Sequence, residues 1–193
     1  MEKNEVVACD NDNKNEIILD TPDNKKTNFF KEWILPILIS IGIVFLLNKF
    51  VFINVCLPPS GSMIPSLNYN DRLIATRVWN KDEIKRGDIL VFKSDEIDKI
   101  LIKRVIGLPG DHVEINNGIV SVNGTVLEED YVKNNEDYNG IFNVPDDKIF
   151  FLGDNRSNSY DSRYWDNPYI DKSDIEGKAQ IRYYPIKDFE LIK

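Results

Sequence analysis

Ser62 is the first residue whose surroundings suggest chemistry. It lies in the stretch Leu57-Pro-Pro-Ser-Gly-Ser-Met-Ile-Pro65, where prolines stiffen both sides and Gly61 permits a backbone turn. A serine in such a turn can present its hydroxyl and its own N–H in one direction, which acyl transfer requires of a nucleophile and an oxyanion donor. The same run is also typical of an ordinary surface loop. The serine therefore needs a base before it indicates an active site.

Two residues could serve as the base for Ser62. The single histidine, His112, follows a predicted turn at the start of a predicted strand, where a structural or surface role is more common. An unprotonated lysine can replace histidine if burial lowers its pKa by several units from about 10.4. Lys103 meets that requirement best, because strand alternation can turn one residue of the Lys103–Arg104 pair inward. Such a pair usually faces solvent, so both bases stay open on local chemistry.

A third polar cluster lies between Gly153 and Arg163. Asp161 and Arg163 could form a charge-assisted pair, and a buried serine hydroxyl in this cluster could hold a neutral lysine amine in line. The alternatives are a capped polar loop with local turns, or a loop that binds a divalent cation. The cation is disfavoured, because the cluster contains two arginines that would repel it.

Short strands must position these residues. After residue 66, apolar and β-branched runs alternate with Gly, Asn, Asp and Pro, and they cover residues 72–79, 88–92, 99–108, 112–115, 119–122, 148–153 and 179–184. Asn117-Gly118 and Asn123-Gly124 predict tight hairpin turns between such runs. No long amphipathic helix is predicted here, so we expect a mostly β, antiparallel domain of barrel-like or sandwich-like form.

An apolar segment precedes this domain. Residues 33–47 carry no charge, and the stretch from Trp33 to Ile53 is long enough to cross a hydrocarbon core as a helix. The alternatives are a buried helix of a soluble domain and a cleavable signal peptide. A run that is apolar on every face, with a polar stretch ahead of it and no small-x-small site behind it, favours an uncleaved anchor.

The flanking charges predict an orientation for this anchor. Lys25, Lys26 and Lys31 precede it, whereas residues 54–71 contain no Lys or Arg, so the amino terminus is expected in the cytoplasm. Residues 1–28 are polar and are expected to form a mobile cytoplasmic tail. The predicted organisation is therefore a tail at 1–28, a transmembrane anchor at 29–53 and an extracytoplasmic domain at 54–193.

Composition excludes several classes of function. The net charge of -8 argues against nucleic acid, because a duplex-binding domain needs a basic surface to neutralise phosphates. Cys9 and Cys56 flank the apolar segment, so across a membrane they could not pair. Neither a disulfide framework nor a cysteine metal site is expected, and no cofactor is predicted.

The order of the motifs resembles that of the bacterial type I signal peptidases. After the apolar segment come Pro59-Ser-Gly-Ser-Met-x-Pro65, Arg86-Gly-Asp-Ile-Leu-Val-Phe92, Lys103-Arg-Val-Ile-Gly-Leu-Pro-Gly-Asp111 and Gly153-Asp-Asn-Arg-x-Asn-Ser-x-Asp-Ser-Arg163. The short interval between the last two blocks resembles the compact Gram-positive form. The resemblance implies a coiled antiparallel β-sheet domain, as in signal peptidases and SOS-repressor-type proteases, behind a single amino-terminal transmembrane helix.

The resemblance also implies roles for individual residues. Ser62 matches the nucleophile and Lys103 its general base, while the Ser60 hydroxyl and the Ser62 N–H match the oxyanion hole. Ser159 resembles the residue that orients the lysine amine. The remaining expected site residues are the supporting Asp154, Asp161 and Arg163, and the substrate-binding Met63, Leu101 and Ile102.

The implied reaction is hydrolysis of the peptide bond after a signal sequence, with small residues one and three positions before the cut. The expected partners are preproteins and the lipid bilayer, and we expect a monomer in the cell membrane. Two alternatives stay open. One is a catalytically silent, membrane-anchored binding module on the same scaffold. The other is a self-cleaving Ser-Lys protease of the SOS-repressor type, which would require a soluble DNA-binding amino-terminal domain.

Overall fold

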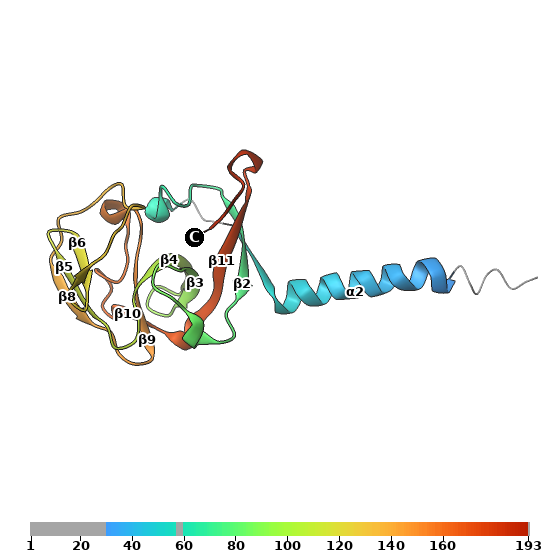
Figure 1. The fold of residues 1–193 in the computed structure, drawn as a ribbon, viewed down its shortest axis with the longest axis horizontal. Helices are drawn as coiled ribbons and strands as arrows, with labels where there is room; N and C mark the ends of the chain where they lie inside the picture. Colours follow the sequence, from blue (N-terminus) through green and yellow to red (C-terminus); the bar gives the residue numbers. More distant parts are fainter. Residues whose placement is uncertain (1–29, 57–59, 193) are drawn as a thin grey trace, which may run out of the picture. The chain divides into compact units, whose positions relative to one another are not determined.

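The computed structural model describes residues 30–56 and 60–192 (Figure 1). The expected tail at 1–28, the first anchor residue and Pro59 of the serine motif lie outside these residues. The described chain begins with one π-helical turn, Phe30–Ile34, followed by helix α2, Leu35–Phe50. The other helical elements are 3₁₀ turns at Gly61–Met63, Lys81–Glu83, Arg156–Asn158, Lys172–Asp174 and Ile186–Asp188.

Helix α2 is apolar around its whole circumference. Its large side chains are exposed on every side, as at Leu38, which is 54% exposed, and Phe45, which is 65% exposed. The only charged residue of α2 is Lys49, in the last turn. Among the described residues, no helix combines the length and the apolarity that a membrane crossing requires.

The carboxyl end of α2 differs from the sequence-based expectation. The helix ends at Phe50, and Phe52–Cys56 forms strand β1, which pairs antiparallel with β2. The prediction that the helix runs on to Ile53 is therefore wrong at this end. The reason is that β2 supplies hydrogen-bond partners for the backbone of residues 52–56, and the β-branched Ile53 and Val55 suit a strand.

The larger sheet has the antiparallel order β1-β2-β11-β3-β4-β9-β10, and β12 also pairs with β11. Its strands are β1 (Phe52–Cys56), β2 (Arg72–Arg77), β3 (Ile89–Ser94), β4 (Lys99–Gly107), β9 (Lys148–Leu152), β10 (Tyr169–Asp171), β11 (Ile175–Tyr184) and β12 (Glu190–Leu191). Strand β4 is paired with β3 along the segment 99–104, but its pairing with β9 begins only at Arg104. Within the described chain, the segment 99–103 thus leaves one β4 edge unpaired.

The smaller sheet has the order β7-β6-β5-β8, with strands β5 (His112–Asn116), β6 (Ile119–Val122), β7 (Thr125–Val126) and β8 (Gly140–Asn143). Its two hairpin turns are the Asn-Gly pairs. Asn117, Gly118, Asn123 and Gly124 all have positive φ angles, which asparagine and glycine tolerate best. The prediction of tight hairpins at both pairs is confirmed.

Strand β9 explains why one run of the sequence is apolar at every position. Ile149 and Phe151 face a core cluster with Phe92, whereas Phe150 and Leu152 face a second cluster with the smaller sheet. The Phe92 and Phe151 rings stack with centroids 4.2 Å apart. A strand covered on both faces loses the polar alternation of a surface strand. The mostly β, antiparallel fold is therefore confirmed, and the larger sheet carries the candidate site.

Candidate active site

Ser62 is held in a tight 3₁₀ turn and is only 7% exposed. Asn155 fixes this turn from a distant part of the chain: its N–H donates to the Ser62 carbonyl at 3.0 Å, and its Nδ2 donates to the Gly61 carbonyl at 2.9 Å. A Cβ atom on residue 61 would lie 2.5 Å from the Tyr69 hydroxyl, so any larger residue there would require Tyr69 to move. The Ser60 hydroxyl donates to Ser62 Oγ at 3.2 Å.

Lys103 is buried on strand β4, with 3% of its surface exposed. Its Nζ donates to Ser159 Oγ at 3.0 Å. The pKa of Lys103 is lowered to about 8, chiefly by burial and also by Arg163, against the opposing effect of Asp161 and Asp154. A substantial fraction of this amine is therefore neutral at mildly alkaline pH. Ser62 and Lys103 line the same groove, although no hydrogen bond between described atoms joins them directly.

Asp161 and Arg163 form a buried ion pair behind Ser159. Arg163 Nε lies 2.8 Å from Asp161 Oδ1, and Arg163 also donates to the Ser159 carbonyl at 3.4 Å. The second oxygen of Asp161 accepts the Gly153 N–H at 2.9 Å. The pair therefore fixes the backbone on both sides of the Ser159 hydroxyl, which in turn fixes the Lys103 amine.

Arg104 is buried as well, which the sequence did not suggest. Strand alternation was expected to turn only one of the two basic residues inward, but Arg104 is 5% exposed. It lies on the opposite face of β4 from Lys103, where Asp154 accepts two hydrogen bonds from its guanidinium at 2.8 and 2.7 Å. The Tyr131 ring covers the guanidinium at 4.0 Å. A bidentate partner and an aromatic face compensate for the desolvation of this charge.

Sequence reasoning missed the loop that supports these residues. Glu129 accepts two hydrogen bonds from Arg156, and Glu136 accepts one from Arg163 at 2.8 Å. Asn134 donates to Asn155 Oδ1 at 2.9 Å, and so orients the amide that holds the Ser62 turn. The only signal in the sequence was an acidic and amide-rich segment before a block with two arginines, and such segments are common in solvent-exposed loops.

The structure does not place His112 at this site. It lies on β5 of the smaller sheet, where it is exposed and its Nδ1 is 2.7 Å from Asn143 Oδ1. It does not line the groove that contains Ser62 and Lys103. Lys103 is therefore better placed than His112 to act on Ser62.

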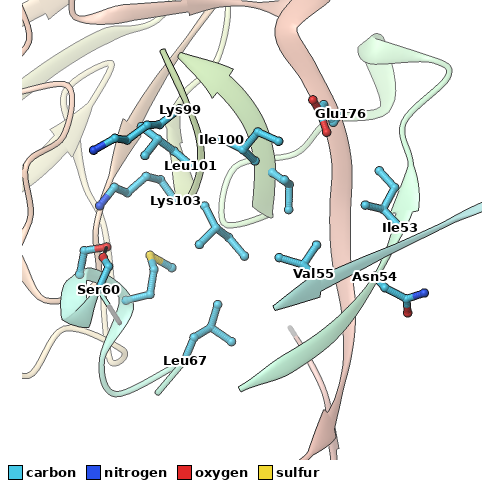
Figure 2. A pocket seen from close by; sticks show the side chains of 14 residues that line it. Ile53, Asn54, Val55, Ser60, Leu67, Lys99, Ile100, Leu101, Lys103 and Glu176 are labelled. Atoms are coloured by element: carbon cyan, nitrogen blue, oxygen red, sulfur yellow. Dashed lines mark hydrogen bonds between the residues drawn. The ribbon is translucent and has the colours of Figure 1, made fainter. Parts of the chain in front are cut away.

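The groove beside Ser62 is mainly apolar and has a volume of about 450 Å³ (Figure 2). Met63, Leu101 and Ile102, the three residues expected to bind substrate, all line it. Figure 2 shows Val55 of β1 and Leu101 of β4 on different sides of the hollow. The remaining lining residues are Ile53, Asn54, Val55, Ser60, Leu67, Val91, Lys99, Ile100 and Glu176.

Gly153 packs against both Ser159 and Ser62, so its replacement tests whether their positions matter for activity. A Cβ at this position would collide with Ser159 Oγ and would lie 2.5 Å from the Ser62 carbonyl. We expect Gly153→Ala to lower kcat/KM at least about 10²-fold, since small displacements of reacting groups have effects of that size. The control is Gly124→Ala, which strains a remote hairpin at a φ of 80° where a Cβ has open space. Equal loss of activity in both variants would contradict the prediction.

Comparison with known proteins assigns this chain to a family. The family model described as "Signal peptidase, peptidase S26" matches residues 30–184. The probable signal peptidase I-2 of a Synechocystis strain is 37% identical over 179 residues, which cover 89% of this chain and 79% of that protein. Signal peptidase I P of Bacillus subtilis subsp. natto is 37% identical over 181 residues, which cover 88% and 96% of the two chains.

One solved structure is also similar to this chain. The crystal structure of a signal peptidase I from Enterococcus faecalis V583 is 34% identical, covers 50% of this chain and 96% of its own, and has a TM-score of 0.44. The family model alone spans well over half of the present chain. The chain therefore belongs to the signal peptidase I family of serine endopeptidases, peptidase family S26.

Proposed function

We propose that this chain is a membrane-bound endopeptidase that removes signal peptides from secreted preproteins after a small-x-small motif, with Ser62 as nucleophile and Lys103 as general base. One observation carries the proposal. A buried lysine amine with a lowered pKa is held by Ser159 in the groove that Ser62 also lines. Burial of an ammonium is costly, so a buried lysine that is held by a serine hydroxyl is more often functional than structural.

The proposed reaction proceeds by acyl transfer. The neutral Lys103 amine takes the Ser62 proton while Oγ attacks the scissile carbonyl carbon, and the Ser62 N–H and Ser60 hydroxyl stabilise the oxyanion. The Lys103 ammonium then gives that proton to the departing amine of the mature protein. Water then attacks the acyl carbon while Lys103 takes its proton. The acyl–Oγ bond breaks, Lys103 returns the proton to Ser62 Oγ, and the signal peptide leaves with a free carboxyl group. Asp161, Arg163 and Asp154 support the site without contacting the reacting atoms.

The topology supports an extended substrate. The free edge of β4 at residues 99–103 and the outer edge of β1 both border the groove, and each offers backbone groups to an added strand. Alternate side chains of an extended peptide would then point into the apolar hollow around Met63 and Leu67. The membership of the signal peptidase I family supports small side chains one and three residues before the cut, and these would lie against this apolar wall.

We further propose that the apolar segment containing α2 anchors the chain in the cell membrane. Its uniformly apolar and exposed surface suits contact with lipid, and Lys31 lies just before it. The proposed topology is a single pass with residues 1–28 in the cytoplasm and the β domain outside. Such an anchor would concentrate a monomeric enzyme in the plane where preproteins are held.

Cleavage of a labelled preprotein by the detergent-solubilised full chain tests this function. We expect one cut, located by sequencing of the new amino terminus, directly after the small-x-small motif. Replacement of the small residue before the cut by phenylalanine should block cleavage, because the proposed motif requires a small side chain at this position. A chain that binds the preprotein without cutting it would support the silent binding module instead. Cleavage of its own chain alone would support the self-cleaving protease.

A further inference from the structure

Glu176 is a carboxylate in an otherwise apolar part of the groove. It lines the same hollow as Ile53, Val91 and Ile100, and it is partly exposed. Among the described residues, no hydrogen bond or ion pair engages its carboxylate. The groove has two other charged residues, Lys99 and Lys103, but Figure 2 shows both on the side away from Glu176. A carboxylate in apolar surroundings favours a cationic or hydrogen-bond-donating partner.

A β-bulge accounts for the position of Glu176. Ile175 pairs with Phe92 and Gly177 pairs with Val91, so Glu176 is an extra residue between two consecutive pairs of the β11–β3 ladder. Bulges of this kind redirect a side chain and are common beside active sites. Gly177 lets β11 approach Ile53, since a Cβ there would lie 3.0 Å from the Ile53 side chain. Glu176 is thereby brought to the wall of the groove beside β1.

We infer that Glu176 is a specificity-determining residue that selects preproteins with a basic side chain in the segment just before the small-x-small motif. The inference rests on the proposed function, because it places the signal peptide in this groove. It names a substrate class beyond the small-x-small rule: signal peptides with lysine or arginine at a position whose side chain enters the hollow near Glu176.

The geometry of an extended peptide restricts which positions qualify. Side chains alternate between the two faces of a strand, so the third and fifth residues before the cut share the face of the residue that enters the pocket at Met63. At about 3.3 Å per residue, these positions reach away from Ser62 along the β4 segment 99–103. The proposed motif requires a small residue at the third position, so the fifth position is the one open to a basic side chain. The second and fourth residues point to the opposite face and cannot reach Glu176.

The experiment uses the detergent-solubilised full chain and a set of synthetic signal-peptide substrates with an alanine one residue before the cut. A single lysine is placed in turn at the second, third, fourth and fifth positions before the cut, and kcat/KM is compared with that of the all-alanine peptide. We expect the ratio of lysine to alanine peptide to be about tenfold higher at the fifth position than at the second and fourth, the size typical of one hydrogen bond to a charged group. Lysine at the third position should prevent cleavage, because the proposed motif requires a small residue there.

Variants of Glu176 separate recognition from general effects. Glu176→Gln should reduce the ratio of kcat/KM for the lysine peptide to that for the alanine peptide to about one. Glu176→Lys should reverse the preference, so that a peptide with glutamate at the same position is cleaved better than the lysine peptide. Glu114→Lys, at an exposed position of β5, is the matched control. It should leave the lysine-to-alanine ratio of kcat/KM the same as in the unmodified chain. If the ratio at the fifth position equals the ratios at the second and fourth positions, or if Glu176→Lys keeps the preference for lysine, the inference is wrong.

The same data distinguish this failure from failure of the proposed function. Cleavage of the all-alanine peptide after its small residue would uphold the peptidase even where the lysine preference is absent. If no peptide is cleaved, the proposed function fails first, and the role of Glu176 in selecting substrates fails with it.

Discussion

Replacement of Ser62 by alanine is expected to lower kcat/KM for a preprotein by a factor on the order of 10⁴ to 10⁶. The physical reason is that the serine Oγ is the only atom of the Gly61–Met63 turn that can form the acyl bond, so the remaining groups can only bind and polarise the substrate. The measurement is the rate of appearance of mature protein, with the variant at high concentration so that a small residual rate is detectable.

The fold should survive this change. Ser62 is held through its backbone carbonyl by Asn155, and this contact does not depend on the side chain. Circular dichroism and thermal unfolding should therefore match those of the unmodified chain. Ser121→Ala, in the smaller sheet, is the matched serine control and should retain full activity. Normal processing of the preprotein by the Ser62→Ala chain would show that Ser62 is not the nucleophile.

Replacement of Lys103 by methionine is expected to have an effect of similar size. Methionine keeps most of the buried aliphatic volume and removes only the amine, so Ser62 loses its proton acceptor while the packing on β4 is retained. The serine hydroxyl is a weak nucleophile without a base, and we expect kcat/KM to fall by at least about 10⁴-fold. The same preprotein assay measures this effect.

Two results control for this variant. Lys133→Met, at an exposed position of the 127–139 loop, should leave kcat/KM unchanged. The stability of Lys103→Met at neutral pH should equal or exceed that of the unmodified chain, because the variant no longer buries an ammonium. An active Lys103→Met chain would point to a different base. An unfolded one would assign the lysine a structural role.

Several of the longer strands and both Asn-Gly turns of the β domain were predictable because their signals are local, whereas the short strands β7, β8, β10 and β12 were not predicted. The Asn-Gly pairs at 117 and 123 require positive φ angles, and this alone predicts the hairpins. The run Lys148–Leu152 was recognisable as a strand from composition. Strand β1 was not, because Phe52 and Ile53 continue an apolar run, and only the distant β2 makes them a strand. The boundary between the helix and β1 is set by pairing with β2, so it could not be predicted from the residues around it.

The candidate site was predictable mainly from the order of its motifs. Considered alone, Ser62 fits an ordinary surface loop and Lys103 a solvent-facing strand. Their placement along one groove depends on contacts with distant residues, namely Asn155 for Ser62 and Ser159 for Lys103. Arg104 was missed because its burial depends on Asp154, fifty positions away in the chain. Glu176 was missed because a bulge carries no clear sequence signature, and the surrounding strand resembles an ordinary surface strand.

The pH dependence of kcat/KM tests the central claim most directly, namely that a neutral Lys103 activates Ser62. The lysine acts only when unprotonated, so activity should increase about tenfold per pH unit in the acid range and level off above its pKa of about 8. The His112→Asn chain should give the same profile. A profile that levels off near 6.5, the usual pKa of histidine, and that is lost in His112→Asn would contradict the account.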